Sequence, residues 1–222
     1  MSELGQSTMF ESILYRAEVP EYLNKLNEIC DSWIAKSRRI KQKEIKERNK
    51  KYGVDVGDHG MSYHTAGDLY KAPGMEDFES FVRATARNIL DSQGFDLINH
   101  SMKYTEMWVQ QFADKGGGHH DTHTHWDNHI SGFYFLKCSD RTSQPKFHDP
   151  RPGRMMMQLP FKDLKTLCTG MDNFLIKPKP GTLVFFNSYL PHEFKVDNGI
   201  DAFRFIHFNL KATQVQLPEK NA

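Results

Sequence analysis

Five of the eleven histidines of this 222-residue chain lie between His119 and His129. Within this stretch His123, His125, Asp127 and His129 follow one another at intervals of two residues. Side chains two residues apart on an extended strand point to the same face. Several metal-binding groups can therefore converge from one short piece of backbone, and we expect a metal site here. A solvent-exposed polar loop is the alternative interpretation.

A further histidine follows a second apolar segment. Thr182–Phe186 has the composition of a buried strand, and His192 comes shortly after it. In a jelly roll, strands far apart in sequence lie side by side, so His192 can face the first cluster. Two histidines and one carboxylate leave three coordination positions open, which suits non-haem Fe(II). The predicted metal ligands are His125, Asp127 and His192, with His123 as the alternative to Asp127.

The residues before the site predict two helices. Apolar residues at intervals of three and four between Leu23 and Ile34 indicate the first helix. Lys36–Lys51, with nine Lys or Arg against two Glu, extends it as a solvated face or, alternatively, as a basic handle for a polyanion. Tyr52–Pro73 reads as a long loop. A second amphipathic helix covers Phe78–Leu90 and ends before Gly94.

From residue 101 onward the period changes to two, which indicates strands. About eight strands after two helices predict a mainly β, cupin-like jelly roll with the helices packed on one side. We expect one domain over residues 1–222, with a mostly helical part (1–100) and a jelly-roll core (101–212). The expected strands are Phe10–Tyr15, Tyr104–Phe112, Ser131–Leu136, Lys146–His148, Met155–Leu159, Asn173–Lys177, Thr182–Phe186 and Phe203–Leu210.

Composition limits the classes of partner. The formal net charge is +1, which argues against a nucleic-acid-binding protein. No apolar run approaches the roughly 20 residues that span a bilayer, and the N-terminus does not resemble a signal peptide. Cys30, Cys138 and Cys168 are odd in number and far apart, which indicates a reducing compartment, so we expect a cytoplasmic protein. A homodimer is left open.

These segments together resemble the 2-oxoglutarate/Fe(II)-dependent oxygenases, and most closely a group of bacterial and bacteriophage members. The resemblance covers roughly residues 101–210. It rests on Trp108-Val109-Gln110, on His123-Thr124-His125 to Ser131-Gly132-Phe133-Tyr134-Phe135-Leu136, on Phe147-His148-Asp149-Pro150-Arg151, on Pro180-Gly181-Thr182-Leu183-Val184-Phe185-Phe186 to His192, and on Arg204 to Leu210. It implies a double-stranded β-helix, Fe(II), and 2-oxoglutarate and dioxygen as co-substrates.

The resemblance does not decide whether His123 or Asp127 is the metal ligand, and it leaves the position of Arg204 undecided. The superfamily's His-x-Asp pair fits His125 and Asp127, whereas the group's His-x-His before Ser-Gly fits His123 and His125. Charge favours Asp127, because a carboxylate helps to neutralise Fe(II). Alignment of the segment's end places Arg204 one position later than the family's arginine.

The resemblance implies a hydroxylase of unknown substrate, either a small molecule or a protein side chain. A strand arginine can bind a dicarboxylate through two hydrogen bonds, so Arg204 is expected to hold the far carboxylate of 2-oxoglutarate. An edge-strand arginine in water is the alternative. Tyr104, Gln110 and Tyr134 are weaker candidates for this pocket. The competing functions are a cupin-type dioxygenase or isomerase without 2-oxoglutarate, and a non-enzymatic metal- or ligand-binding jelly roll.

Overall fold

The large sheet is the central element of the molecule. The computed structural model describes residues 5, 7–151, 153, 159–163 and 166–215. All neighbouring strands of the large sheet are antiparallel. Their order is β1 (Leu14–Glu18), β8 (Thr182–Asn187), β5 (Ile130–Lys137), β10 (Arg204–Gln214), β3 (His100–Phe112) and β2 (Ser62–His64).

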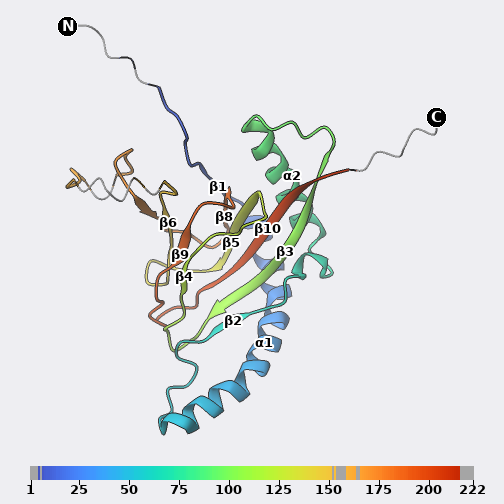
Figure 1. Ribbon diagram of the computed structural model, residues 1–222. Helices are drawn as coiled ribbons and strands as arrows, with labels where there is room; N and C mark the ends of the chain where they lie inside the picture. Colours follow the sequence, from blue (N-terminus) through green and yellow to red (C-terminus); the bar gives the residue numbers. More distant parts are fainter. Residues whose placement is uncertain (1–4, 6, 152, 154–158, 164–165, 216–222) are drawn as a thin grey trace.

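A smaller sheet faces this one. Its four antiparallel strands have the order β4 (His120–His123), β9 (His192–Phe194), β6 (Pro145–His148) and β7 (Asn173–Leu175). Figure 1 shows β4, β9 and β6 on one side of the large sheet and both long helices on the other. From β3 onward consecutive strands lie in different sheets, except for β6 and β7, which share the small sheet. This arrangement is that of a jelly roll, and the expected fold class is confirmed.

Phenylalanines fill the space between the two sheets. Phe112, Phe133 and Phe205 from the large sheet meet Phe147 and Phe194 from the small one in a single buried cluster. Many of these rings pack edge to face; Phe133 and Phe194, for example, have centroids 5.0 Å apart at 71°. Each fully buried phenyl stabilises the fold by about 2–3 kcal/mol relative to an exposed one. The result is a tightly packed apolar interior between the two sheets.

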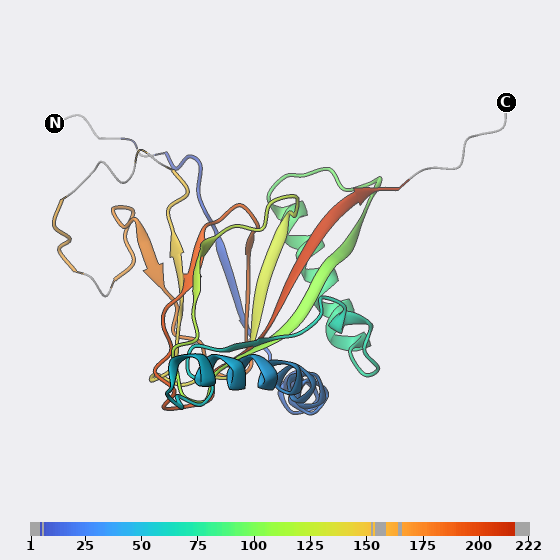
Figure 2. The ribbon, with the colours of Figure 1, turned by 60° about the horizontal axis from the view of Figure 1, so that its bottom comes forward.

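The helices cover the outer face of the large sheet. They are α1 (Leu23–Tyr52) and α2 (Glu76–Ser92), accompanied by the short 3-10 helices η1 (Pro20–Tyr22) and η2 (Leu69–Lys71). The first half of α1 buries Leu26, Cys30 and Ile34, which follow at intervals of four residues. Its second half is mostly solvated and basic, and it runs beneath the sheets in the view of Figure 2. None of the helices in the described ranges is long and apolar enough to span a membrane.

Alternate residues of the large sheet's strands point into two separate hydrophobic cores, one on each face of the sheet. Val109, Ile206 and Phe208 point to the helix side, whereas Phe112 and Phe205 point between the sheets. This alternation follows from the two-residue period of a strand. A register shift in the pairing of β10 with β3 interrupts it, between the partners of Asn209 and Leu210.

Several element predictions need correction. The first strand begins at Leu14, so Phe10–Tyr15 is placed too early. The expected loop Tyr52–Pro73 contains β2 and η2, because Ser62–His64 pairs with the end of β3. Most of the expected strand Met155–Leu159 lies outside the described residues.

Candidate metal centre

His123 and His192 are brought together by strand pairing. β4 and β9 are antiparallel, and His123 is the direct partner of His192. Cross-strand partners on one face lie close enough for their side chains to touch. The two ring centroids are 4.5 Å apart. His192 is almost fully buried, whereas His123 lies nearer the surface.

His125 joins them from the segment that follows β4. Its backbone N–H donates to Ser188 O at 2.9 Å, which fixes this segment against the turn between β8 and β9. Its ring lies 5.0 Å from that of His123 and 5.1 Å from that of His192, centroid to centroid. One ligand atom from each of the three histidines lies within 4.8 Å of the other two. Three imidazoles therefore surround one point.

Hydrogen bonds on the far side of the rings leave nitrogen lone pairs facing this point. The Nδ1 of His123 donates to Asp121 O at 2.7 Å, and the Nδ1 of His192 donates to Leu190 O at 3.0 Å. A carbonyl can only accept, so the proton of each neutral ring sits on Nδ1 and the lone pair on Nε2. The Nε2 atoms of His125 and His192 are buried without a partner among the described residues. Unpartnered buried polar atoms are costly, and a shared metal ion would satisfy them.

Burial favours the neutral form of the rings of His125 and His192. Burial, followed by the proximity of other histidines, lowers the pKa of His125 to about 3. Burial likewise lowers the pKa of His192 to about 3 and that of His120 to about 4. Desolvation disfavours the charged form of a base, and neighbouring imidazolium charges would add to this. A neutral imidazole is the form that binds a metal, so the site is ready for one at neutral pH.

Asp127 is not part of this group in the structure. It has a positive φ of 64° and turns its carboxylate to Lys211, with an Oδ1–Nζ distance of 2.6 Å. Its side chain is 68% exposed. β4 ends at His123, and the turn at residues 126–127 breaks the two-residue alternation that was expected to carry on to Asp127. The structure thus places His123, rather than Asp127, with His125 and His192.

Residues 106–209 match the family model described as "Putative 2OG-Fe(II) oxygenase". The match confirms the resemblance seen in the sequence: this part of the chain is similar to the 2OG-Fe(II) oxygenases. The matched range begins in β3, ends in β10 and contains all three clustered histidines.

Two solved structures agree with this chain at the level of the fold. A non-heme monooxygenase, ThoJ, in complex with nickel has a TM-score of 0.55 at 6% identity. The match covers 91% of this chain and 76% of the ThoJ chain. The carbocyclase SnoK from nogalamycin biosynthesis has a TM-score of 0.50 at 12% identity, covering 94% and 84%. An oxidoreductase of the 2OG-Fe(II) oxygenase family from Burkholderia pseudomallei has a TM-score of 0.43 at 10% identity. The match covers 63% of this chain and 58% of that protein. No curated protein sequence matches the chain.

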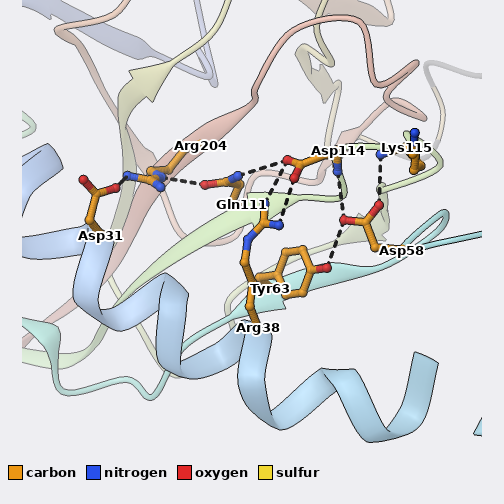
Figure 3. A network of polar contacts seen from close by, with 8 residues as sticks. All are labelled: Asp31, Arg38, Asp58, Tyr63, Gln111, Asp114, Lys115 and Arg204. Atoms are coloured by element: carbon orange, nitrogen blue, oxygen red, sulfur yellow. Dashed lines mark hydrogen bonds and ion pairs between the residues drawn. The ribbon is translucent and has the colours of Figure 1, made fainter. Parts of the chain in front are cut away.

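The expected placement of Arg204 in an oxygenase co-substrate pocket needs correction. Arg204 shares the strand face of Ile206 and points toward α1, away from the histidines. Its Nη1 lies 2.6 Å from Asp31 Oδ1 and its Nε donates to Gln111 Oε1 at 2.8 Å. Figure 3 shows this network running from α1 across β10 and β3. A one-residue offset on a strand reverses the face to which a side chain points, and the resemblance had placed Arg204 one position later than the family's arginine.

Two tyrosines expected in the oxygenase pocket also lie on the helix side. The Tyr104 hydroxyl donates to Glu79 O at 2.7 Å, and the Tyr134 hydroxyl donates to Val19 O at 2.9 Å. The register shift of β10 against β3 skips Thr105, which places Tyr104 on the opposite face from its expected neighbours. Gln110 does lie on the histidine side, where its amide contacts His120 and Ser62.

Sequence reasoning missed a buried polar group behind His125. His207 is buried between His125 and Trp108, with ring centroids 4.4 Å and 4.2 Å away. Asn209 contacts both His125 and His207. Both residues occur in the otherwise apolar segment Phe203–Leu210, and polar side chains in an apolar strand were the available signal.

Proposed function

We propose that the protein is an Fe(II)- and 2-oxoglutarate-dependent hydroxylase whose iron is held by His123, His125 and His192. One observation carries the proposal: three imidazoles converge on one point, and two of their buried nitrogens have no partner among the described residues. Three protein ligands leave three positions of an octahedral ion for co-substrate and dioxygen. The proposed substrates are small molecules or protein side chains.

The protein's own contribution is to position the metal and to exclude water. The carbonyls of Asp121 and Leu190 hold two imidazoles with Nε2 toward the ion. Phe133, Phe147 and Phe186 surround the His192 ring at centroid distances of 4.8–5.7 Å and keep that side dry. Iron with 2-oxoglutarate and dioxygen supplies the oxidising power when bound.

Arg204, the residue expected to bind the far carboxylate of 2-oxoglutarate, does not lie on the histidine side of the sheet. Arg204 is the one Lys or Arg that is buried among the described residues, and it pairs with Asp31 on the other face of the sheet. We therefore assign no anchoring role to it. Gln110 remains our proposal for a neutral co-substrate contact, because its amide lies on the histidine side of β3.

The proposal is tested by anaerobic addition of Fe(II) and then 2-oxoglutarate to the purified protein. We expect one bound iron per chain and a weak visible charge-transfer band that appears only with both components. His192→Ala should lose the band, because it removes the ligand that comes from the other strand. A protein that binds no Fe(II), with neither a band nor a change in thermal stability, would contradict the proposal.

A cupin-type dioxygenase or isomerase without 2-oxoglutarate is the second candidate. It is favoured by the all-histidine donor set together with the absence of a buried cation near it among the described residues. Succinate formation that depends on 2-oxoglutarate separates the two. Iron binding without a band or succinate would favour the second candidate. A closed structural zinc site has four protein ligands, whereas three groups converge here among the described residues.

A further inference from the structure

His125 differs from the other two histidines in what its Nδ1 contacts. His123 and His192 each face a backbone carbonyl, which sets their tautomer. The Nδ1 of His125 instead lies 3.2 Å from the side-chain amide nitrogen of Asn209. An amide offers a donor on one end and an acceptor on the other, so its orientation decides which ring nitrogen of His125 carries the proton.

Asn209 is fully buried and held on several sides. Its Oδ1 accepts from Ser131 Oγ at 2.6 Å and lies 3.0 Å from His207 Nε2. Ser131 Oγ is in turn 2.8 Å from Ser188 Oγ, and the backbone carbonyl of Ser188 holds His125. One buried polar network therefore reaches His125 through both its ring and its backbone.

As placed, the amide nitrogen would donate to Nδ1 and leave the proton of His125 on Nε2. That tautomer cannot bind a metal through Nε2, although this atom is buried and unpartnered toward the other histidines. An amide turned by 180° has the same shape, so the turned form fits the same space. Its oxygen then accepts from His125 Nδ1, and its nitrogen donates to Ser131 Oγ and to His207 Nε2.

The neighbours of Asn209 can adapt to this orientation. A serine hydroxyl both donates and accepts, and a neutral His207 accepts at Nε2 when its proton is on Nδ1. Glu106 Oε1, 3.4 Å from the amide nitrogen, loses a donor, but Glu106 is only half-buried and can reach water.

We propose that Asn209 is a positioning residue for the metal centre: in the metal-bound protein its amide oxygen accepts the His125 Nδ1 proton and directs Nε2 to the ion. This inference rests on the proposed metal centre. It assigns Asn209 the role that a carbonyl or carboxylate often has behind a metal-bound histidine.

Two substitutions at Asn209 test whether metal binding needs a hydrogen-bond acceptor or a hydrogen-bond donor at this position. Asn209→Asp keeps an acceptor of the same size and removes the donor, whereas Asn209→Leu removes both. We expect Asn209→Leu to weaken Co(II) and Fe(II) binding about 10–100-fold, and Asn209→Asp to bind within about threefold of the parent or more tightly. Affinities are measured anaerobically by calorimetry. Thermal unfolding of the metal-free proteins separates lost folding from lost binding.

Asn187 provides the matched control. It is a half-buried asparagine at the end of β8 whose amide pairs with Gln93 at 3.0 Å and makes no hydrogen bond to the three histidines. Asn187→Asp and Asn187→Leu should leave metal affinity unchanged. Asn209→Asp binding as weakly as Asn209→Leu, or Asn209→Leu binding like the parent, would overturn the inference.

A second measurement does not depend on how the variants fold. Nitrogen-15 spectra of the histidine rings in the Zn(II)-loaded parent should show His125 protonated on Nδ1 and metal-bound at Nε2. A proton on Nε2 of His125 would refute the role of Asn209 while leaving the metal centre intact. Failure of the parent to bind any metal would instead refute the proposed function.

Discussion

At the scale of single residues, the proposed metal centre consists of three histidines that are held in place by different contacts. His192 and His123 are opposite each other on paired strands, and each is held by a carbonyl two residues before it. His125 lies outside any strand and is held by Ser188 and Asn209. A fixed ring orientation limits the entropy lost on metal binding, and it also limits which ions fit.

The first prediction compares His123 with Asp127. His123→Ala removes an imidazole from the group of three and should lower Fe(II) affinity sharply. Asp127→Ala removes an exposed carboxylate paired with Lys211, so its effect should stay within a few-fold. Anaerobic titration of both variants beside the parent decides between them. Loss of binding in Asp127→Ala alone would restore the two-histidine, one-carboxylate site.

The second prediction concerns pH. The pKa of His192 is about 3 in the folded chain and 6.5 as its ordinary value, so the unfolded chain binds more protons between these values. The free energy of unfolding of the metal-free protein should therefore fall as the pH drops below about 6.5. The slope is at most about 1.4 kcal/mol per pH unit for each such histidine. His192→Gln, in urea titrations from about pH 4.5 to 7.5, should reduce the slope. Parallel curves for parent and variant would contradict the shifted pKa.

Spacing singled out His123 and His125, and the position of His192 after an apolar strand singled out that residue, but neither signal could choose between His123 and Asp127. That choice depends on where β4 ends, and a single turn decides it. The placement of Arg204 depended on strand parity, which is reversed by an offset of one residue. Asn209 and His207 could not be assigned, because the face of a strand is known only once its register is known.

At the scale of elements, Arg204 connects the large sheet to α1. Asp31 and Asn27 on α1 and Gln111 on β3 all lie within hydrogen-bond reach of its guanidinium. The Arg204 side chain is 5% exposed, whereas that of Asp31 is 62% exposed. The charge is therefore buried on the strand and compensated from the helix.

The third prediction tests this connection. Asp31→Asn leaves the buried guanidinium without its carboxylate and should lower the free energy of unfolding by about 1–3 kcal/mol. The partial exposure of Asp31 keeps the loss below that of a fully buried pair. Metal affinity should not change. Glu28→Gln, an exposed carboxylate on the same helix, is the control and should lie within about 0.5 kcal/mol of the parent.

The fourth prediction concerns Gly132 in β5. A Cβ at this position would overlap the Phe208 ring on β10 and the carbonyl oxygen of Val184 on β8. In an alanine variant these two strands could therefore not lie as close to β5 as they do in the parent. Gly132→Ala should cost about 1–3 kcal/mol or prevent folding, as judged by thermal unfolding. Gly153, which has no atom of the described residues within 4 Å of an added Cβ, provides the neutral substitution Gly153→Ala. Equal melting temperatures for the two variants would disprove the close packing.

The helices and most strands were predictable because their periods are strong. The apolar positions of α1 and α2 and the alternation in β3 are visible in the sequence. β2 was not predictable, since its three residues are ordered by pairing with the end of β3 rather than by their own pattern. The register shift near Thr105 was equally hidden, because it arises from the pairing of two strands.

At the scale of the whole molecule, a bound metal should stabilise the native state. Its contribution is about 2.7 kcal/mol when free metal exceeds the dissociation constant a hundredfold. For a chain of this size that corresponds to a rise in melting temperature of roughly 5–10 °C. The fifth prediction is that anaerobic Fe(II) or Co(II) produces such a shift in the parent and none in His192→Ala. A shift of the same size in His192→Ala would place the ion elsewhere.

The pairing of β4 with β9 has a consequence for order within the molecule. The two strands share only two registered pairs, with a shift between them, whereas β3 and β10 pair along most of their length. An ion held by His123 and His192 would act as a cross-link between segments distant along the chain, at the place where backbone pairing is sparsest. Without it, amide hydrogens of β4 and β9 should exchange with solvent well before those of β3 and β10. The pairing of β4 with β9 in the small sheet would then depend on whether an ion is bound, while the large sheet would remain folded without it.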